Sequence, residues 1–230
     1  MPDRFARTHI EWRRAWRVIP SKYPPIHLFE DLTEDPAEWD LLAELESAVN
    51  PRVRQESGEI SIFPPELRVV STIVMAPFVH LNPMGSRFSD GSYGVYYAAE
   101  HLETAIRETI YHLEIRLRAG AAAPDDLDQR AYVGMIEGAF VDLTTDPSAA
   151  TPLMDPEEYG RSQAFGAEVR AAGDDGIMFE SVRHVDHRAV AVFIPTRVSP
   201  PVQERHLRYE WDGIRIRRYF DYSTDQWVDV

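Results

Sequence analysis

The sequence predicts an α+β fold, with a mixed or antiparallel β core and flanking helices, built as a single domain over residues 1–230. Short apolar stretches with strand character alternate irregularly with three stretches of helical periodicity. A doubly wound parallel sheet would alternate strands and helices regularly. No linker long enough to divide the chain is visible, and an apolar share of 44% in 230 residues provides a substantial core.

The N-terminal part is predicted to begin with a short strand and an extended segment. Residues 15–21 (AWRVIPS) have strand character and end near Pro20. Residues 22–29 should be extended, because each proline disfavours helix in the residue before it. Further along, residues 71–81 (STIVMAPFVHL) are apolar enough to be buried.

The first helix is expected over residues 35–50. Asp35 followed by Pro36, with Glu38 three residues after Asp35, is typical of a helix start. The sequence WDLLAELESAV then keeps helical periodicity up to an Asn-Pro pair. Residues 52–82 give no clear pattern apart from their apolar end.

The middle of the chain predicts a strand and then a long helix. Residues 94–99 (GVYYAA) form an apolar strand after a turn-forming sequence, and they place Tyr96 and Tyr97 on opposite faces. The helix is expected over Leu102–Arg118. Its apolar stripe comprises Leu102, Ala105, Ile106, Leu113 and Leu117.

Glu108 lies off this apolar stripe. It shares a flank of the helix with Thr104, His112 and Ile115. The flank faces either a cleft or solvent, and the helical pattern alone does not decide between them.

The next segment predicts four strands. Residues 130–143 (RAYVGMIEGAFVDL) are interpreted as two strands joined by a hairpin at Glu137 and Gly138. Residues 176–182 and 189–195 are apolar and bounded by polar residues, so we expect two buried strands there.

A helix and a hairpin complete the prediction. The helix should open at Asp155 and Pro156 and end before Gly173. The pair Asp212 and Gly213 between apolar residues is a strong signal for a hairpin with a type I′ turn.

Composition excludes several classes of function. The 24 basic and 38 acidic residues give a formal charge of −14, which disfavours binding to DNA or RNA. The chain has no cysteine, so disulfides, thiolate metal sites and a cysteine nucleophile are excluded. No apolar run approaches the length of a membrane span, and the N-terminus lacks a signal peptide. We therefore expect a cytoplasmic protein that binds neither membrane nor nucleic acid.

Common cofactor and metal motifs are absent from the sequence. There is no dinucleotide-binding G-x-G-x-x-G, no phosphate-binding P-loop, no G-x-S-x-G elbow and no H-E-x-x-H. His184 and His187 are three residues apart without an obvious third ligand, so we expect no metal.

Three polar residues in the middle of the chain are candidates for a functional site. Arg87, Tyr97 and Glu108 are spaced ten and eleven residues apart, across a turn, a strand and the first turns of a helix. Ser181 follows a later buried strand. These four side chains can converge on one cleft, and a cation, a ring and a carboxylate suit a ligand with phosphates, a flat heterocycle and a glycosidic bond.

Each candidate also has a simpler explanation when it is taken alone. Arg87 would be a surface turn residue, and Glu108 a solvated residue of a helix. Tyr97 would be a core aromatic whose hydroxyl is hydrogen-bonded. Ser181 alone carries no functional signal.

The four residues together resemble the RES-domain family. The family pattern runs roughly G-R-W-N, Y, E and S-V-R, and Arg87, Tyr97, Glu108 and Ser181 fall on its positions in order. The resemblance extends from about Trp16 to Trp211. Arg17 matches an early arginine of the family, and the strand AVAVFIP matches its V-A-V-F-x-P strand. The core of the match covers about residues 80–211, with residues 52–83 as an apparent insertion, and the match is specific in the middle and vague at both ends.

The resemblance implies a fold similar to ADP-ribosyltransferases and an enzyme that consumes NAD as its substrate. Members are typically toxins, so it also implies an Xre-like helix-turn-helix antitoxin as partner. Two departures stand out. Phe88 and Ser89 replace the Trp-Asn pair of many members, and Glu180 replaces a proline before the Ser-Val-Arg sequence.

The resemblance also implies a role for each site residue. Glu108 would stabilise positive charge on the ribose during cleavage. Arg87 would bind the pyrophosphate, and Tyr97 would stack on nicotinamide. Ser181 would hydrogen-bond the ribose or the acceptor, and Phe88 and Arg183 would complete the NAD-binding set.

The acceptor of ADP-ribose stays open at this point. Phosphate, water and a protein side chain are all compatible with the residues, which correspond to an NAD phosphorylase, an NAD glycohydrolase and a protein mono-ADP-ribosyltransferase. A non-catalytic module that binds NAD or ADP-ribose and an interaction protein that pairs with an antitoxin are the alternatives from other classes.

Overall fold

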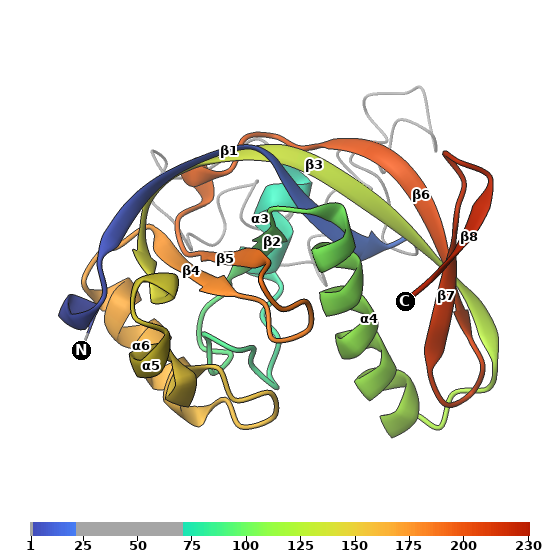
Figure 1. The fold of residues 1–230 in the computed structure, drawn as a ribbon, viewed down its shortest axis with the longest axis horizontal. Coiled ribbons are helices and arrows are strands. Elements are labelled where there is room, and N and C mark those ends of the chain that lie inside the picture. Colours follow the sequence, from blue (N-terminus) through green and yellow to red (C-terminus); the bar gives the residue numbers. More distant parts are fainter. Residues whose placement is uncertain (1, 22–70) are drawn as a thin grey trace, which may run out of the picture.

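The computed structural model describes residues 2–21 and 71–230 (Figure 1). The extended segment expected at 22–29, the helix expected at 35–50 and most of the apparent insertion therefore lie outside the described residues.

One mixed sheet organises the described residues. Its strand order is β1-β2-β5-β4-β3-β6-β7-β8, with an additional pairing between β1 and β3. Only β3 and β4 run parallel, and the other pairs are antiparallel. The strands are β1 Arg7–Pro20, β2 Tyr96–Ala99, β3 Asp125–Asp142, β4 Gly176–Glu180, β5 Arg188–Val192, β6 Val202–Trp211, β7 Ile216–Asp221 and β8 Gln226–Asp229.

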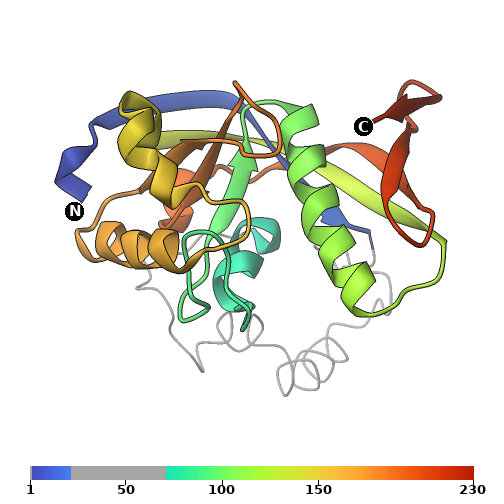
Figure 2. The same cartoon turned by 60° about the horizontal axis from the view of Figure 1, so that its bottom comes forward.

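Helices lie on both sides of a central region under the long strands. In Figure 1, β1 and β3 arch over the molecule, with α4 on one side below them and α5 and α6 on the other, and Figure 2 shows the same separation from a second direction. The helices are α3 Thr72–Val79, α4 Leu102–Ala119, α5 Pro147–Ala150 and α6 Gly160–Ala171. The expected α+β class is confirmed.

The N-terminal strand is much longer than the predicted segment 15–21. β1 begins at Arg7 and pairs with β3 along its length, with a bulge between Trp12 and Ala15. Ile10 and Trp12 are buried while Glu11 and Arg13 are exposed. β1 therefore shows the alternation of a strand with one solvent-exposed face, but the charged residues on that face obscured the pattern in the sequence.

The hairpin predicted at Glu137 and Gly138 is wrong. β3 continues through both residues, with Glu137 opposite Glu11 and Gly138 opposite Ile10 of β1. A Cβ at Gly138 would lie 2.6 Å from Oδ2 of Asp175, whose carboxylate accepts the backbone N–H of Ala139. The glycine permits this close approach and does not mark a turn.

The helix over Leu102–Arg118 is confirmed as α4. Ala105, Ile106 and Ile110 are buried in a cluster with strands β1, β3 and β6. Leu102, Leu113 and Leu117 pack against that cluster, as the predicted stripe requires. Glu103 in the first turn and Arg116 and Arg118 in the last turn match the helix dipole.

The last predicted helix starts later than expected. Asp155 Oδ1 accepts the backbone N–H groups of Glu157 and Glu158, at 2.9 and 2.8 Å, and so closes a separate turn. α6 begins only at Gly160, and it ends before Gly173, which has the positive φ of 82° that favours glycine.

The hairpin between β6 and β7 is confirmed, but its turn is not type I′. The backbone N–H of Asp212 donates to the carbonyl of Arg215, which puts Gly213 and Ile214 at the tip. Only Gly213 has a positive φ, of 94°, whereas a type I′ turn needs positive φ at both central residues. A second hairpin, β7–β8, follows it.

Close packing fixes the turn that carries Arg87. A Cβ on Gly166 of α6 would lie 2.2 Å from the carbonyl oxygen of Phe88. The Phe88 ring is fully buried and packs edge-on against Phe179 at 5.1 Å. Helix α6 and the 86–89 turn therefore approach as closely as backbones can, and only glycine allows it.

Gly166→Ala should destabilise the protein by about 1–3 kcal/mol, because the added methyl group must push α6 away from the 86–89 turn. Urea unfolding followed by circular dichroism measures this. Gly160→Ala is the matched control in the same helix, since a Cβ there meets nothing within 4 Å. Equal stability of the two variants would contradict the proposed packing constraint.

Candidate functional site

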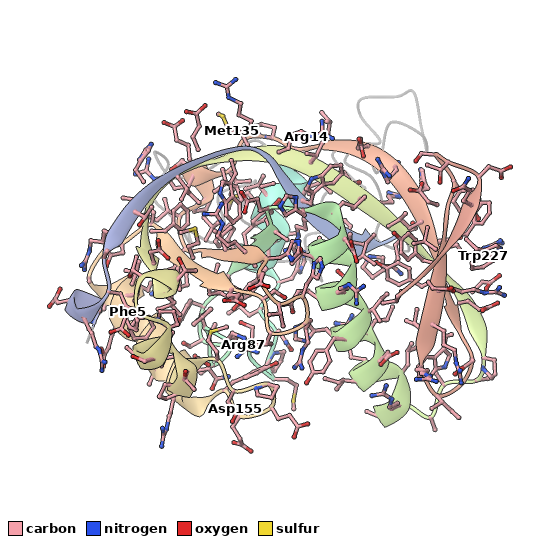
Figure 3. The ribbon with its side chains drawn as sticks, in the orientation of Figure 1. Phe5, Arg14, Arg87, Met135, Asp155 and Trp227 are labelled. Atoms are coloured by element: carbon pink, nitrogen blue, oxygen red, sulfur yellow. The ribbon has the colours of Figure 1, made fainter. Side chains whose placement is uncertain are left out.

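Four separate elements bring the predicted site residues to the region between α4 and α6. Arg87 lies in a turn closed by the bridge between Ser86 and Ser89, and Tyr97 lies in β2. Glu108 lies in α4, and Ser181 directly follows β4. Figure 3 shows Arg87 between these helices, with Asp155 below it.

A hydrogen bond joins Ser181 to Glu108. Ser181 Oγ lies 2.6 Å from Oε1 of Glu108, and Ser181 is only 1% exposed. The same Oγ accepts the backbone N–H groups of Arg183 and His184, both at 3.1 Å. Since a hydroxyl has one proton, these contacts direct it to the Glu108 carboxylate.

The Glu108 carboxylate lies in a mostly dry, positively charged setting. Burial raises the pKa of Glu108, while the Ser181 hydrogen bond and the charges of Arg87 and Arg183 oppose that rise. Thr104 and Glu108 on this flank of α4 therefore face the site, whereas His112 and Ile115 further along the flank are exposed. A desolvated carboxylate held in one orientation can stabilise a developing cation.

Arg87 is not the surface residue that a turn arginine usually is. It is 8% exposed, and Nη1 donates to the carbonyl oxygens of Asp155 at 2.7 Å and Leu153 at 3.4 Å. Its guanidinium carbon lies 4.7 Å from the centre of the Tyr159 ring.

Arg183 is held in a similar way from the other side. Nη2 donates to the carbonyl oxygen of Pro156 at 2.6 Å. Its guanidinium stacks on the Tyr111 ring of α4, with the carbon 3.3 Å from the ring centre. Both arginines thus contact the same short segment, and the charge of each acts on the Glu108 carboxylate.

The Tyr97 hydroxyl is already engaged by the 86–89 turn. It lies 2.9 Å from Ser86 Oγ and accepts the backbone N–H of Phe88 at 3.0 Å. Burial raises the pKa of Tyr97 to about 12, so the phenol is neutral at physiological pH. Tyr97 therefore orients the turn that delivers Arg87.

Two further arginine and tyrosine contacts support Tyr97. Arg17 of β1 donates from Nη1 to the Tyr97 carbonyl oxygen at 2.8 Å. Its guanidinium also lies over the ring of Tyr96, at 4.8 Å. Tyr96 is buried on the opposite face of β2, as the sequence predicted.

The role expected for Phe88 does not fit this structure. The ring has no exposed surface and belongs to a core cluster with Phe179, Val141 and Phe193. Its backbone N–H and carbonyl are bound by the hydroxyls of Tyr97 and Tyr93. Phe88 therefore supports the site from the core and does not present a ring to a ligand.

The sequence did not point to Tyr111, Tyr159 or the segment between the 3-10 turn Thr151–Leu153 and α6. Tyr111 donates to the Pro156 carbonyl oxygen at 3.1 Å, and Tyr159 lies beneath Arg87. The only sequence signal for this segment was the Asp155-Pro156 pair, which predicted a helix start. In the structure the backbone carbonyls of these two residues accept hydrogen bonds from Arg87 and Arg183.

The histidines near Ser181 stack on each other. The rings of His184 and His187 are 3.6 Å apart and nearly parallel, and His184 Nδ1 lies 2.9 Å from Thr104 Oγ1 of α4. Within residues 2–21 and 71–230, no group of three or more potential ligands is placed to hold a metal ion.

The structure also contains a cavity away from the candidate site. A cavity of about 300 Å³ is lined by His9 of β1, by Met135 of β3 and by Arg197 of the turn after β5, and by none of the candidate site residues. No helix in the described part of the chain is both long and apolar enough to cross a bilayer.

Comparison with known proteins gives a family match, a protein of similar sequence and a solved structure. The RES domain matches residues 65–212. The uncharacterized protein y4oC of Sinorhizobium fredii (strain NBRC 101917 / NGR234) is 31% identical over 203 residues, which cover 87% of this chain and 84% of that protein. The crystal structure of the M. tuberculosis MbcT–MbcA toxin–antitoxin complex contains a chain of 10% identity, with a TM-score of 0.47 and coverage of 92% of this chain and 90% of that chain.

The family match covers more than half of the chain and includes Arg87, Tyr97, Glu108 and Ser181, which the structure brings together. The relative from Sinorhizobium extends the similarity over most of the remaining length. This protein belongs to the RES-domain family.

Proposed function

We propose that this protein consumes NAD by cleaving the bond between ribose and nicotinamide and transfers ADP-ribose to phosphate or water. One observation carries the proposal. The Glu108 carboxylate is desolvated, is fixed by the Ser181 hydroxyl at 2.6 Å, and lies within the field of Arg87 and Arg183. A carboxylate beside two anion-binding groups suits a substrate that joins a pyrophosphate to a cleavable glycosidic bond.

The chemistry needs no metal or additional reactant beyond the acceptor. The electron pair of the glycosidic bond leaves with nicotinamide, which becomes neutral, and the ribose carbon acquires positive charge. The Glu108 carboxylate stabilises that charge without gaining a proton. An oxygen of phosphate or water then forms the new bond to the ribose carbon, and a water acceptor releases its proton to solvent.

The remaining residues position the substrate in this proposal. The planar guanidinium groups of Arg87 and Arg183 would bind the pyrophosphate through paired hydrogen bonds. Ser181 holds the Glu108 carboxylate in one orientation through its hydroxyl. Tyr97 fixes the 86–89 turn through its hydroxyl, and its ring is the candidate for contact with nicotinamide.

The biological role follows from the family resemblance. An enzyme that removes NAD harms the cell that makes it, so we propose a toxin that is neutralised by a cognate antitoxin, of the Xre-like helix-turn-helix kind. Toxicity on expression that the product of a neighbouring gene relieves would support this role.

Glu108→Gln should reduce NAD loss by at least about 10²–10³-fold, because an amide keeps the shape of the side chain but not the charge that stabilises the transition state. Purified protein is incubated with NAD, and nicotinamide release is followed by mass spectrometry. Glu103→Gln is the matched control on the same helix, where Glu103 is exposed and bound to Arg107.

The products distinguish the possible acceptors in the same assay. ADP-ribose indicates hydrolysis, ADP-ribose-1″-phosphate indicates phosphorolysis, and label on a lysate protein indicates transfer to a side chain. A Glu108→Gln protein that still depletes NAD at the normal rate would overturn the mechanism. Binding of NAD without nicotinamide release by the unaltered protein would select a non-catalytic module.

NAD cleavage should fall on acidification at a higher pH than an ordinary glutamate would give, since burial raises the pKa of Glu108 and only the ionised form is active. Ser181→Ala removes a hydrogen bond that favours the ionised form. It should therefore move the acidic limb of the pH–rate profile upward, by about one pH unit.

The control for this profile is Ser148→Ala, which removes a serine that donates to Asp146 at 2.8 Å outside the site. Its acidic limb should coincide with that of the unaltered protein. An unchanged or lowered limb in Ser181→Ala would exclude Glu108 as the group that titrates.

A further inference from the structure

The two arginines of the site both donate to one short segment of backbone. Arg87 Nη1 donates to the carbonyl oxygens of Leu153 and Asp155, and Arg183 Nη2 donates to that of Pro156. We refer to residues 153–159 as the covering segment. It connects the 3-10 turn after α5 to the start of α6.

Aromatic side chains complete this arrangement on both sides. Tyr111 of α4 donates its hydroxyl to the Pro156 carbonyl oxygen at 3.1 Å, next to the Arg183 contact. Tyr159, at the end of the covering segment, stacks beneath Arg87. The segment therefore bridges the space between α4 and the 86–89 turn, and it leaves Arg87 only 8% exposed.

Backbone carbonyl oxygens are weaker partners for a buried arginine than an anion. A carbonyl oxygen carries a partial charge, whereas a phosphate oxygen carries a full one and forms shorter and stronger bonds with a guanidinium. The side chains of Asp155, Glu157 and Glu158 are exposed on the same segment. Their negative charges disfavour a pyrophosphate beside them. An anionic ligand and the covering segment would also compete for the same two arginines, Arg87 and Arg183.

We infer that the covering segment is a lid, which is closed on Arg87 and Arg183 in the absence of substrate and is displaced when an anionic ligand takes its carbonyls' place. This inference rests on the proposed NAD-binding role of the two arginines. It adds that substrate must first open the lid, so the apparent affinity is lowered by the stability of the closed form.

Asp155 is the residue that shapes the closed lid. Its Oδ1 accepts the N–H groups of Glu157 and Glu158, while its carbonyl oxygen accepts from Arg87. At the far end, Gly160 is exposed and a Cβ there would meet nothing within 4 Å. The lid thus has a local turn that stabilises one conformation and an unobstructed end about which it can move.

The test compares Asp155→Ala with Asp155→Asn. Alanine removes the side-chain acceptor and should loosen the closed lid, which raises the affinity for ADP-ribose by about fivefold if the cap contributes its usual energy. Asparagine removes the same charge but keeps the acceptor, so it measures the electrostatic gain alone, and its affinity should rise less than that of the alanine variant. Isothermal titration calorimetry with ADP-ribose measures both.

A fluorescent label reports the lid directly. The chain has no cysteine, so Glu157→Cys provides a single labelling position on the lid. Saturating ADP-ribose, or inorganic pyrophosphate, should change the emission of the label as the lid leaves the arginines. A label on Ser148→Cys, outside the lid, should not respond.

Several results would contradict the inference that the covering segment is a lid. They are equal gains in affinity for alanine and asparagine, weaker binding by the alanine variant, and a label that responds to neither ligand. Failure of the proposed function is detected separately, as absence of nicotinamide release by the unaltered protein. A label that responds to pyrophosphate in a protein without NAD cleavage would retain the lid and reject only the reaction.

Discussion

The hydrogen bond from Ser181 to Glu108 is the contact on which the site depends. It joins the first turns of α4 to the residue that follows β4, and so links the helix on one side of the sheet to the strands at its centre. Ser181 can form it because two backbone N–H groups already occupy its acceptor positions. A buried carboxylate without such a donor would take up a proton more readily.

Two arginines of the site have backbone carbonyl oxygens as hydrogen-bond partners. In a chain of formal charge −14, Arg87 and Arg183 are held beside one desolvated carboxylate by tyrosine rings and carbonyl oxygens. Aromatic faces satisfy a guanidinium without supplying a counter-charge, so the arginines keep their capacity for an external anion. In this respect the two arginines differ from arginines that pair with a carboxylate at the surface, such as Arg188 with Glu100.

The sequence predicted those elements whose pattern is local. Helix α4 was found because its apolar spacing and terminal charges agree, and β4 and β5 because short apolar runs lie between polar turns. The long strands were missed where tertiary contacts override local signals. Gly138 resembles a turn residue until Asp175 is placed beside it, and the charged residues of β1 conceal a strand with one wet face.

The site was predictable in its residues but not in their exposure. Spacing and family pattern identified Glu108 and Ser181, which are in contact, and Arg87 and Tyr97, which share a turn. The burial of Phe88 could not be predicted, because it follows from the approach of Gly166, 78 positions further along the chain. Tyr111 and Tyr159 were missed because an aromatic residue in a helix or loop has no local mark of stacking on an arginine.

The pairing of β1 with β3 has a consequence for the time at which the site is completed during synthesis. Thr8 donates to Asp142 at 2.8 Å across a separation of 134 residues, and β3 in turn pairs with β4, which precedes Ser181. Contacts so distant in sequence form slowly and only after both partners have left the ribosome. During each round of translation there is therefore an interval in which the nascent chain has not yet assembled the site.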